Sequence, residues 1–350
     1  MSRNHNAARR PRLRLLTLAV VAVALLAAAA CGAGDDDDTA SGSGGEGGGG
    51  KGWTYVDGSG KETKLDATPK KIVMHAYAAA ALIPLGIEPV GIYADTKVED
   101  ERALEGLDLD GVEIVGEEWG NINIEAVAAL EPDLIISEWW PLEKAYSGLE
   151  EGTGSASQKL MDIAPIVGVA QAKSVEGMIE DYVELAGSLG ADVDGPAVTK
   201  ERERFETAKA DFEAAVKAKP GLSVLAVAPS PDGMYIANPD YNAELLDFIA
   251  WGMEVIVPDK PDKGFEYWET LSWENADKYQ ADLLIADQRT YPEAVEEAER
   301  TQPSWKFLKA AATNAVAEWP AWYLRNYGAY ADALADLTKA VEEADPDLVA

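Results

Sequence analysis

Strand-like apolar segments alternate with helical segments along most of this 350-residue chain. After a hairpin over 53–65, strand-like segments occupy 71–74, 89–93, 112–115 and 132–137, and helical segments occupy 78–85 and 124–130. Such alternation favours a parallel sheet that is covered by helices on both faces.

One long helical segment separates this first set from a second. Phe205, Ala208, Phe212 and Ala215 recur three and four positions apart within 197–219, which places them on one face of a helix. At 1.5 Å per residue this helix would be about 35 Å long. Further strand-like and helical segments follow at 223–228, 243–251, 281–286 and 327–343. We therefore predict an α/β fold of two doubly wound lobes joined by a single long α-helix, with a ligand cleft between the lobes.

The N-terminal residues have a different composition. Five arginines precede an uncharged apolar run over 15–30, and the run ends in Ala28-Ala29-Ala30 directly before Cys31. Basic residues, a short apolar run and small residues before a cleavage point are typical of a secretory signal. Cys31, the only cysteine, gives this segment a resemblance to a bacterial lipoprotein signal, so we expect a lipid on Cys31 and anchoring at the extracytoplasmic face of the cell membrane. A buried free thiol is the alternative, and Arg9-Arg10 leave Sec and Tat export both open.

These patterns divide the chain into five predicted regions. They are a signal peptide over 1–30, a flexible Gly/Asp/Ser linker over 31–52, an N-terminal α/β lobe over 53–172, a helical connection over 173–220 that includes the helix 197–219, and a C-terminal α/β lobe over 221–350.

The acidic character of the chain excludes several kinds of partner. Asp and Glu number 62 against 30 Lys and Arg, a net charge of −32, and removal of residues 1–30 would take away five Arg and no acid. Such a chain repels nucleic acid and anionic lipid surfaces, so the lipid on Cys31 would have to hold it at a membrane. Because no second cysteine exists, an intramolecular disulfide and a multi-thiolate metal site are excluded.

Aromatic and polar side chains gather at the carboxyl ends of the predicted strands, where ligands bind in open α/β sheets. Five of the residues at these strand ends are Asp95, Glu138, Asp232, Met234 and Tyr323. We expect ligand contacts from His75, Tyr77, Tyr93, Trp119, Trp139, Trp140, Tyr235, Arg289, Trp319 and Trp322. Neighbouring Trp139 and Trp140 cannot both face a core from an extended strand. Packing at the rim of the cleft is the alternative for the rings, and a surface ion pair is the alternative for Arg289.

His75 bears on whether the chain could bind a metal ion. A site for bare zinc or manganese needs three or four side-chain ligands, yet His75 is the only histidine after the predicted signal peptide and the acids show no metal-ligand spacing. We therefore expect no protein-bound metal and no cofactor. A hydrogen-bonded polar role is the alternative for His75.

Three segments in their order and spacing resemble the ABC-importer substrate-binding proteins for ferric siderophores, haem and vitamin B12. They are TPKKIV at 68–73, ALIPLGIEPVG at 81–91 and INIEAVAALEPDLII at 122–136, and the similarity extends over about 53–343. The resemblance implies a rigid helix between the lobes, cargo in the cleft and a small opening motion. It also implies one carboxylate on each lobe that meets arginines of the permease: Glu274 matches one position, and Glu143 matches the other with a shift of one residue.

The sequence thus predicts a monomeric substrate-binding lipoprotein that captures a ferric siderophore and delivers it to ABC permease membrane subunits. Aromatic walls would suit neutral or cationic hydroxamate chelates through stacking and cation–π contacts, and haem or vitamin B12 are the alternative cargoes. A secreted α/β enzyme lacks support, since the chain has no GxSxG nucleophile elbow. A surface protein that binds a partner's loop in the same cleft is a third hypothesis.

Overall fold

The computed structural model describes residues 52–150, 153, 157–171 and 174–349. The predicted signal peptide, Cys31, nearly all of the predicted linker and the predicted boundary at 172–173 lie outside these residues. None of the helices in the described ranges combines the length and the hydropathy that a membrane span requires.

The first sheet has the order β5-β4-β3-β6-β7, and β8 also pairs with β6. All of its pairs are parallel except β6 with β7. Its strands are β3 (Ile72–His75), β4 (Gly91–Ala94), β5 (Glu113–Glu117), β6 (Leu134–Trp140), β7 (Ala145–Tyr146) and β8 (Ile166–Ala170). The hairpin of β1 (Trp53–Val56) and β2 (Glu62–Leu65) precedes this sheet, as predicted.

Helices cover both faces of the first sheet. Successive residues of a strand point to opposite faces, and β3 shows this: Ile72 and Met74 pack with α1 (Ala76–Leu82) and α3 (Val175–Ser188), whereas Val73 packs in a second cluster with α2 (Ile124–Leu130). Burial on both faces explains why these strands are almost continuously apolar.

The second sheet has the order β12-β10-β9-β13-β14, with β11 beside β9. Its strands are β9 (Ser223–Ser230), β10 (Gly233–Ala237), β11 (Glu254–Val255), β12 (Trp268–Leu271), β13 (Leu283–Asp287) and β14 (Val316–Trp319). The pairs among β9, β11, β13 and β14 are parallel, whereas β10 and β12 add an antiparallel extension. Its helices are α5 (Ala243–Ala250), α6 (Glu293–Thr301) and α7 (Lys309–Ala312).

Short 3-10 helices complete the connections. They are η1 (Ile83–Leu85), η2 (Val98–Asp100), η3 (Arg102–Leu104), η4 (Ser157–Asp162), η5 (Pro239–Tyr241), η6 (Trp273–Lys278) and η7 (Pro303–Phe307).

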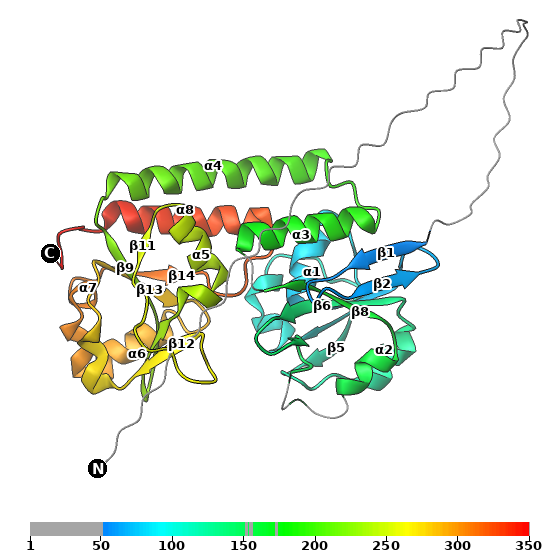
Figure 1. Cartoon of the computed structure of the whole chain (residues 1–350), viewed down its shortest axis with the longest axis horizontal. Coiled ribbons are helices and arrows are strands. Elements are labelled where there is room, and N and C mark those ends of the chain that lie inside the picture. Colours follow the sequence, from blue (N-terminus) through cyan, green and yellow to red (C-terminus); the bar gives the residue numbers. More distant parts are fainter. Residues whose placement is uncertain (1–51, 151–152, 154–156, 172–173, 350) are drawn as a thin grey trace, which may run out of the picture. The chain divides into compact units, whose positions relative to one another are not determined.

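The long helix α4 (Pro196–Ala218) lies one residue from its predicted position and connects α3 to β9. Its start is explained by Pro196 in the first turn, where the missing N–H costs nothing. Phe205 and Phe212 are fully buried, and α4 lies beside α8 (Tyr327–Glu343), as Figure 1 shows. The predicted fold class, two α/β lobes with one long helix, is confirmed.

Candidate functional site

Three aromatic rings from distant parts of the chain meet beside the carboxyl end of β6, and we call them the aromatic seam. Trp140 ends β6, Tyr267 precedes β12 and Trp322 follows β14. The ring centroids of Trp140 and Trp322 are 5.5 Å apart, those of Tyr267 and Trp322 are 5.5 Å apart, and those of Trp140 and Tyr267 are 6.3 Å apart. The seam therefore joins the first lobe to the second through side chains that could stack on a ligand.

A buried carboxyl group holds Trp322 in a strained backbone conformation. Its φ of 73° lies in the left-handed region, which is costly for a bulky residue. Its backbone N–H donates to Oε1 of the buried Glu244 at 2.8 Å. Burial raises the pKa of Glu244 to about 7, although Arg325 acts in the opposite direction. A non-glycine residue kept in this conformation is typical of a functional position.

Arg289 lies against the seam. Its guanidinium carbon is 5.6 Å from the centroid of the Trp322 ring, a cation–π distance. Its Nε donates to both oxygens of Asp287, at 3.0 and 3.1 Å, so the buried Asp287 carboxylate already balances its charge. Arg289 is thus both ion-paired and next to an aromatic ring of the site.

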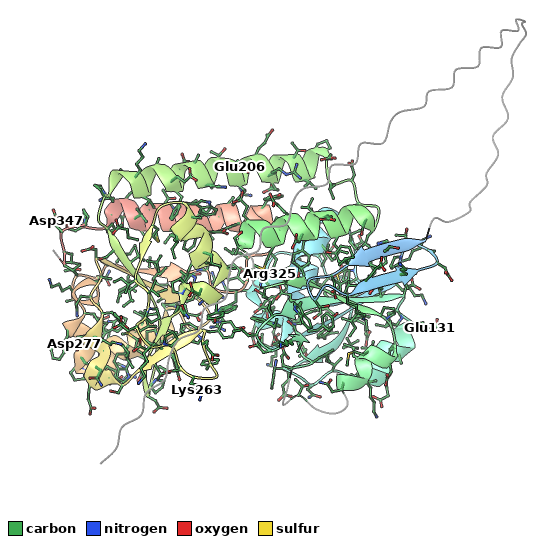
Figure 2. The ribbon with its side chains drawn as sticks, in the orientation of Figure 1. Glu131, Glu206, Lys263, Asp277, Arg325 and Asp347 are labelled. Atoms are coloured by element: carbon green, nitrogen blue, oxygen red, sulfur yellow. The ribbon has the colours of Figure 1, made fainter. Side chains whose placement is uncertain are left out.

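A buried ion pair connects the lobes behind the seam. Arg325, labelled in Figure 2, donates through Nε and Nη2 to the Glu138 carboxylate at the end of β6. Both side chains are almost fully buried, and Gln171 and Tyr182 also donate to Glu138. The Arg325 guanidinium lies 4.9 Å from the centroid of the Tyr77 ring. A buried charge is stable only when its partners are in place. The network therefore holds Arg325 and Glu138 in fixed positions beside the aromatic seam.

His75 ends β3 and is 1% exposed. Its Nδ1 accepts from the backbone N–H of Tyr77, and its Nε2 lies 3.4 Å from Oδ2 of Asp95. Burial, the largest single influence, lowers the pKa of His75, but the carboxylates of Asp95, Glu138 and Glu101 together outweigh burial and the net shift of the pKa is upward. The rings of Tyr77 and Tyr93 lie 5.1 and 5.2 Å from His75. The strand-end residues of β3 and β4 thus come together as the sequence indicated.

Two other aromatic residues of the first lobe lie outside the seam. Trp119 is 47% exposed, and its backbone N–H donates to the carbonyl of Asp95. Trp139 is half-buried and packs edge-on against Tyr146, 5.1 Å between centroids. Neighbouring Trp139 and Trp140 therefore diverge, one toward the sheet's own cluster and one toward the other lobe.

Two aromatic residues of the second lobe form a separate contact. Trp319 is fully buried and Tyr235 is half-buried, and both rings contact Trp268. Among the described residues, neither of these rings pairs with a ring of the aromatic seam, so Trp319 and Tyr235 belong to the wall of the second sheet.

The two carboxylates expected to meet the permease are both exposed. Glu143 accepts hydrogen bonds from the Tyr267 hydroxyl at 3.2 Å, which ties it to the seam across the lobes. Glu274 lies on η6 of the second lobe.

Two hollows flank the contact between the lobes. One of about 160 Å³ is lined by Trp140, Gln171, Tyr241 and Tyr267 among others. The other, of about 280 Å³, is lined by residues that include Arg102, Glu318 and Tyr323. Over the residues that the structure describes, no group of three or more His, Cys, Asp or Glu is arranged to hold a metal ion.

Sequence reasoning missed several residues of this site. Tyr267 precedes β12, which was not recognised as a strand, and Arg325 lies in an irregular segment between β14 and α8. Glu244 sits in the first turn of α5, where an acid is ordinarily a solvent-exposed residue. The end of β6 did point to Glu138, but its partner is 187 residues away in the chain.

Comparisons with known proteins agree with this architecture. The family model described as periplasmic binding protein matches residues 82–323. The Fe(3+)-citrate-binding protein YfmC of Bacillus subtilis is 25% identical over 263 residues, 74% of this chain and 76% of YfmC. The probable siderophore-binding lipoprotein YfiY of the same organism is 38% identical over 91 residues, 26% of this chain and 28% of YfiY.

Among solved structures, the chain is similar to DesE, a ferric-siderophore receptor protein from Streptomyces coelicolor. The two share 32% identity with a TM-score of 0.74, over 84% of this chain and 99% of DesE. The family and these relatives are all named for binding: a periplasmic binding protein, two iron- or siderophore-binding proteins and a ferric-siderophore receptor. This chain belongs to the periplasmic binding protein family.

Proposed function

We propose that this protein is the substrate-binding component of an ABC importer, captures a ferric siderophore of the hydroxamate type and delivers it to the permease. In this proposal the lipid on Cys31 anchors it to the outer face of the cell membrane, and Glu143 and Glu274 meet the permease. The iron arrives as part of the cargo, so the protein itself needs no metal ligands.

The observation that carries the proposal is the aromatic seam between the lobes, in a chain that is 32% identical to a ferric-siderophore receptor over 84% of its length. Aromatic side chains offer flat, apolar walls to a bulky chelate. The location also fits, since ligands of α/β proteins bind beyond the carboxyl ends of strands.

The charges around the seam favour a hydroxamate over more anionic chelates. The guanidinium groups of Arg289 and Arg325 are already paired with Asp287 and Glu138, and Arg102 pairs with Glu318 at 2.8 Å. An anionic catecholate or citrate complex would have to compete with these carboxylates. A ferric trihydroxamate core is neutral and needs no free cation.

In this proposal the seam opens for cargo, because both hollows are small. Sites for small molecules usually measure about 300–1,000 Å³, whereas the two hollows are about 160 and 280 Å³. A chelate would enter by separating Trp140 from Trp322, and the rings would then stack on it.

Titration with a chelate panel tests the proposal. Tryptophan emission is followed while ferric hydroxamate, ferric catecholate, ferric citrate, haem or cobalamin is added. We expect ferric hydroxamates to quench the emission and to bind most tightly. Trp140→Ala and Trp322→Ala should each weaken binding at least tenfold, because each removes a stacking wall. Trp273→Ala is the matched control, since Trp273 packs on Trp305 within the second lobe.

Two results would contradict the proposal. If none of the five ligands changes the tryptophan emission, the assignment of a siderophore cargo is wrong. If haem or cobalamin binds most tightly, the cargo is that ligand instead. Equal losses of affinity in Trp273→Ala and Trp322→Ala would show that the seam has no special role.

A further inference from the structure

The smaller of the two hollows has an apolar lining that continues from the aromatic seam. It measures about 160 Å³ and shares the rings of Trp140 and Tyr267 with the seam. Its other apolar lining residues are Pro141 and Leu142 after β6, Tyr241 at the end of η5, and Leu246 on α5. Both lobes therefore supply apolar side chains to this space, which we call the apolar hollow.

The rings of the apolar hollow have their polar atoms bonded to other groups. The indole N–H of Trp140 donates to Oγ of Ser147 at 2.7 Å. The hydroxyl of Tyr267 donates to the Glu143 carboxylate at 3.2 Å. The Tyr241 ring packs edge-on against the Tyr267 ring, 5.7 Å between centroids. These rings therefore offer carbon surface to a ligand, and the polar atoms of Trp140 and Tyr267 are already used.

The apolar hollow has a buried end and an exposed end. Gln171 lies at the buried end, where its Nε2 donates to Glu138. Leu142, which is 42% exposed, and the exposed Asp240 lie at the other end. Solvent therefore reaches the hollow past Leu142 and Asp240, while its inner wall is fixed by the buried network around Glu138.

The volume and the lining define the group that fits. An apolar cavity of about 150 Å³ holds a benzene ring, so the apolar hollow suits one aromatic ring or a short alkyl group. A charged group would lose its water here without gaining a partner of opposite charge from the apolar walls. A whole chelate is too large, because sites for small molecules usually measure about 300–1,000 Å³.

We propose that the apolar hollow receives an apolar arm of the ferric chelate, and that the protein thereby selects chelates that carry one aryl or short alkyl arm. This inference rests on the proposed function and deepens it. The chelate core lies between Trp140 and Trp322, and the arm passes the Trp140 ring into the hollow. Because both lobes line the hollow, an arm inside it contacts both lobes and favours their closure around the cargo.

A ligand series on the unaltered protein tests the inference. The probes are three linear ferric trihydroxamates that differ only in the acyl group at one end: acetyl, benzoyl or pyridine-4-carbonyl. We expect calorimetry to give a dissociation constant at least tenfold lower for the benzoyl form than for the acetyl form, because a buried ring removes apolar surface from water. The pyridine-4-carbonyl form has the same shape but a polar ring nitrogen, so it should bind at least threefold more weakly than the benzoyl form.

Variants then locate the effect. Leu246→Trp fills the hollow, so the ratio of the acetyl to the benzoyl dissociation constant should fall toward one. Ile249→Trp is the matched control, because Ile249 is on the same helix, is 39% exposed and does not line the hollow. In this variant the ratio should keep its wild-type value. Leu142→Ala removes part of the exposed wall with little risk to folding, and the ratio should fall at least twofold.

The outcomes separate the two claims. Equal affinity for the acetyl and benzoyl chelates, or equal affinity for the benzoyl and pyridine-4-carbonyl chelates, overturns the apolar hollow and leaves siderophore binding intact. Absence of binding by all three chelates overturns the proposed function as well. An equal fall of the ratio in Ile249→Trp, or an unchanged ratio in both Leu246→Trp and Leu142→Ala, places the arm elsewhere and overturns the hollow. If Leu246→Trp does not fold, the ligand series and Leu142→Ala decide.

Discussion

At the scale of single residues, the most constrained side chain of the site is Trp322. Its backbone is left-handed, its N–H donates to Glu244, and Trp140 and Tyr267 pack on its ring. Oε2 of Glu244 is buried without a partner over the described residues. A neutral, protonated Glu244 suits this setting better than a carboxylate.

The pH dependence of stability tests this role of Glu244. Its folded-state pKa of about 7 exceeds the ordinary value of 4.5, so the folded protein holds this proton more tightly than the unfolded chain. Stability should therefore be lost as pH rises from 5 to 8, by about 2–3 kcal/mol from this group. The measurement compares urea unfolding of wild type and Glu244→Gln across this range. We expect the free energy of unfolding of Glu244→Gln to rise relative to that of wild type as pH rises. A difference between the two that does not change with pH would contradict the assignment.

Residue types at strand ends indicated which side chains come together, but they did not indicate the contact partners of these side chains. His75, Tyr93 and Trp140 could be placed because the carboxyl ends of parallel strands share an edge. The divergence of Trp139 and Trp140 also follows from the alternation of a strand. Arg325 and Tyr267 could not be placed, since only the tertiary fold brings them to Glu138 and Trp140.

At the scale of elements, α4 illustrates how much periodicity alone can predict. Phe205, Phe212 and Ala215 form the buried face that their spacing indicated, and Ala208 is half-buried. The antiparallel strands β10 and β12 were missed. The turn at Pro231-Asp232 is a hairpin signal. In contrast, β12 is a short strand with a single exposed residue, so it lacks the alternation of buried and exposed residues that marks a strand in a sequence.

Truncation on α4 measures what this packing contributes. Phe212 is fully buried and its ring lies 5.5 Å from that of Phe248 on α5. Phe212→Ala should lower the free energy of unfolding by about 3–5 kcal/mol through lost contacts and a cavity. Glu213→Ala, at the exposed neighbouring position, should change it by less than about 0.5 kcal/mol. Similar urea midpoints for both variants would show that α4 is not packed as described.

At the scale of the whole molecule, cargo binding and delivery are predicted to use different surfaces. Glu143 and Glu274 are exposed carboxylates, and charges of this kind mainly set the rate and register of association. Glu143→Arg with Glu274→Arg should leave the affinity for ferric hydroxamate within about threefold yet abolish iron uptake by cells. The control pair is Glu206→Arg with Glu299→Arg, two exposed acids on α4 and α6.

The link between Glu143 and Tyr267 makes the affinity measurement essential here. The variant loses the hydrogen bond from Tyr267, which is one of the rings of the seam. A large fall in the affinity for ferric hydroxamate would therefore assign Glu143 to cargo binding in the cleft and not to permease docking. Normal uptake by the double variant would remove the docking role of both residues.

The position of iron in a complex tests the central claim most directly. Crystals grown with a ferric trihydroxamate and measured at the iron absorption edge give an anomalous peak at the metal alone. The account predicts one peak between the lobes, beside the rings of Trp140 and Trp322 and beyond the carboxyl ends of β3, β4 and β6. A peak elsewhere on the protein, or none from crystals grown at saturating chelate, would contradict it.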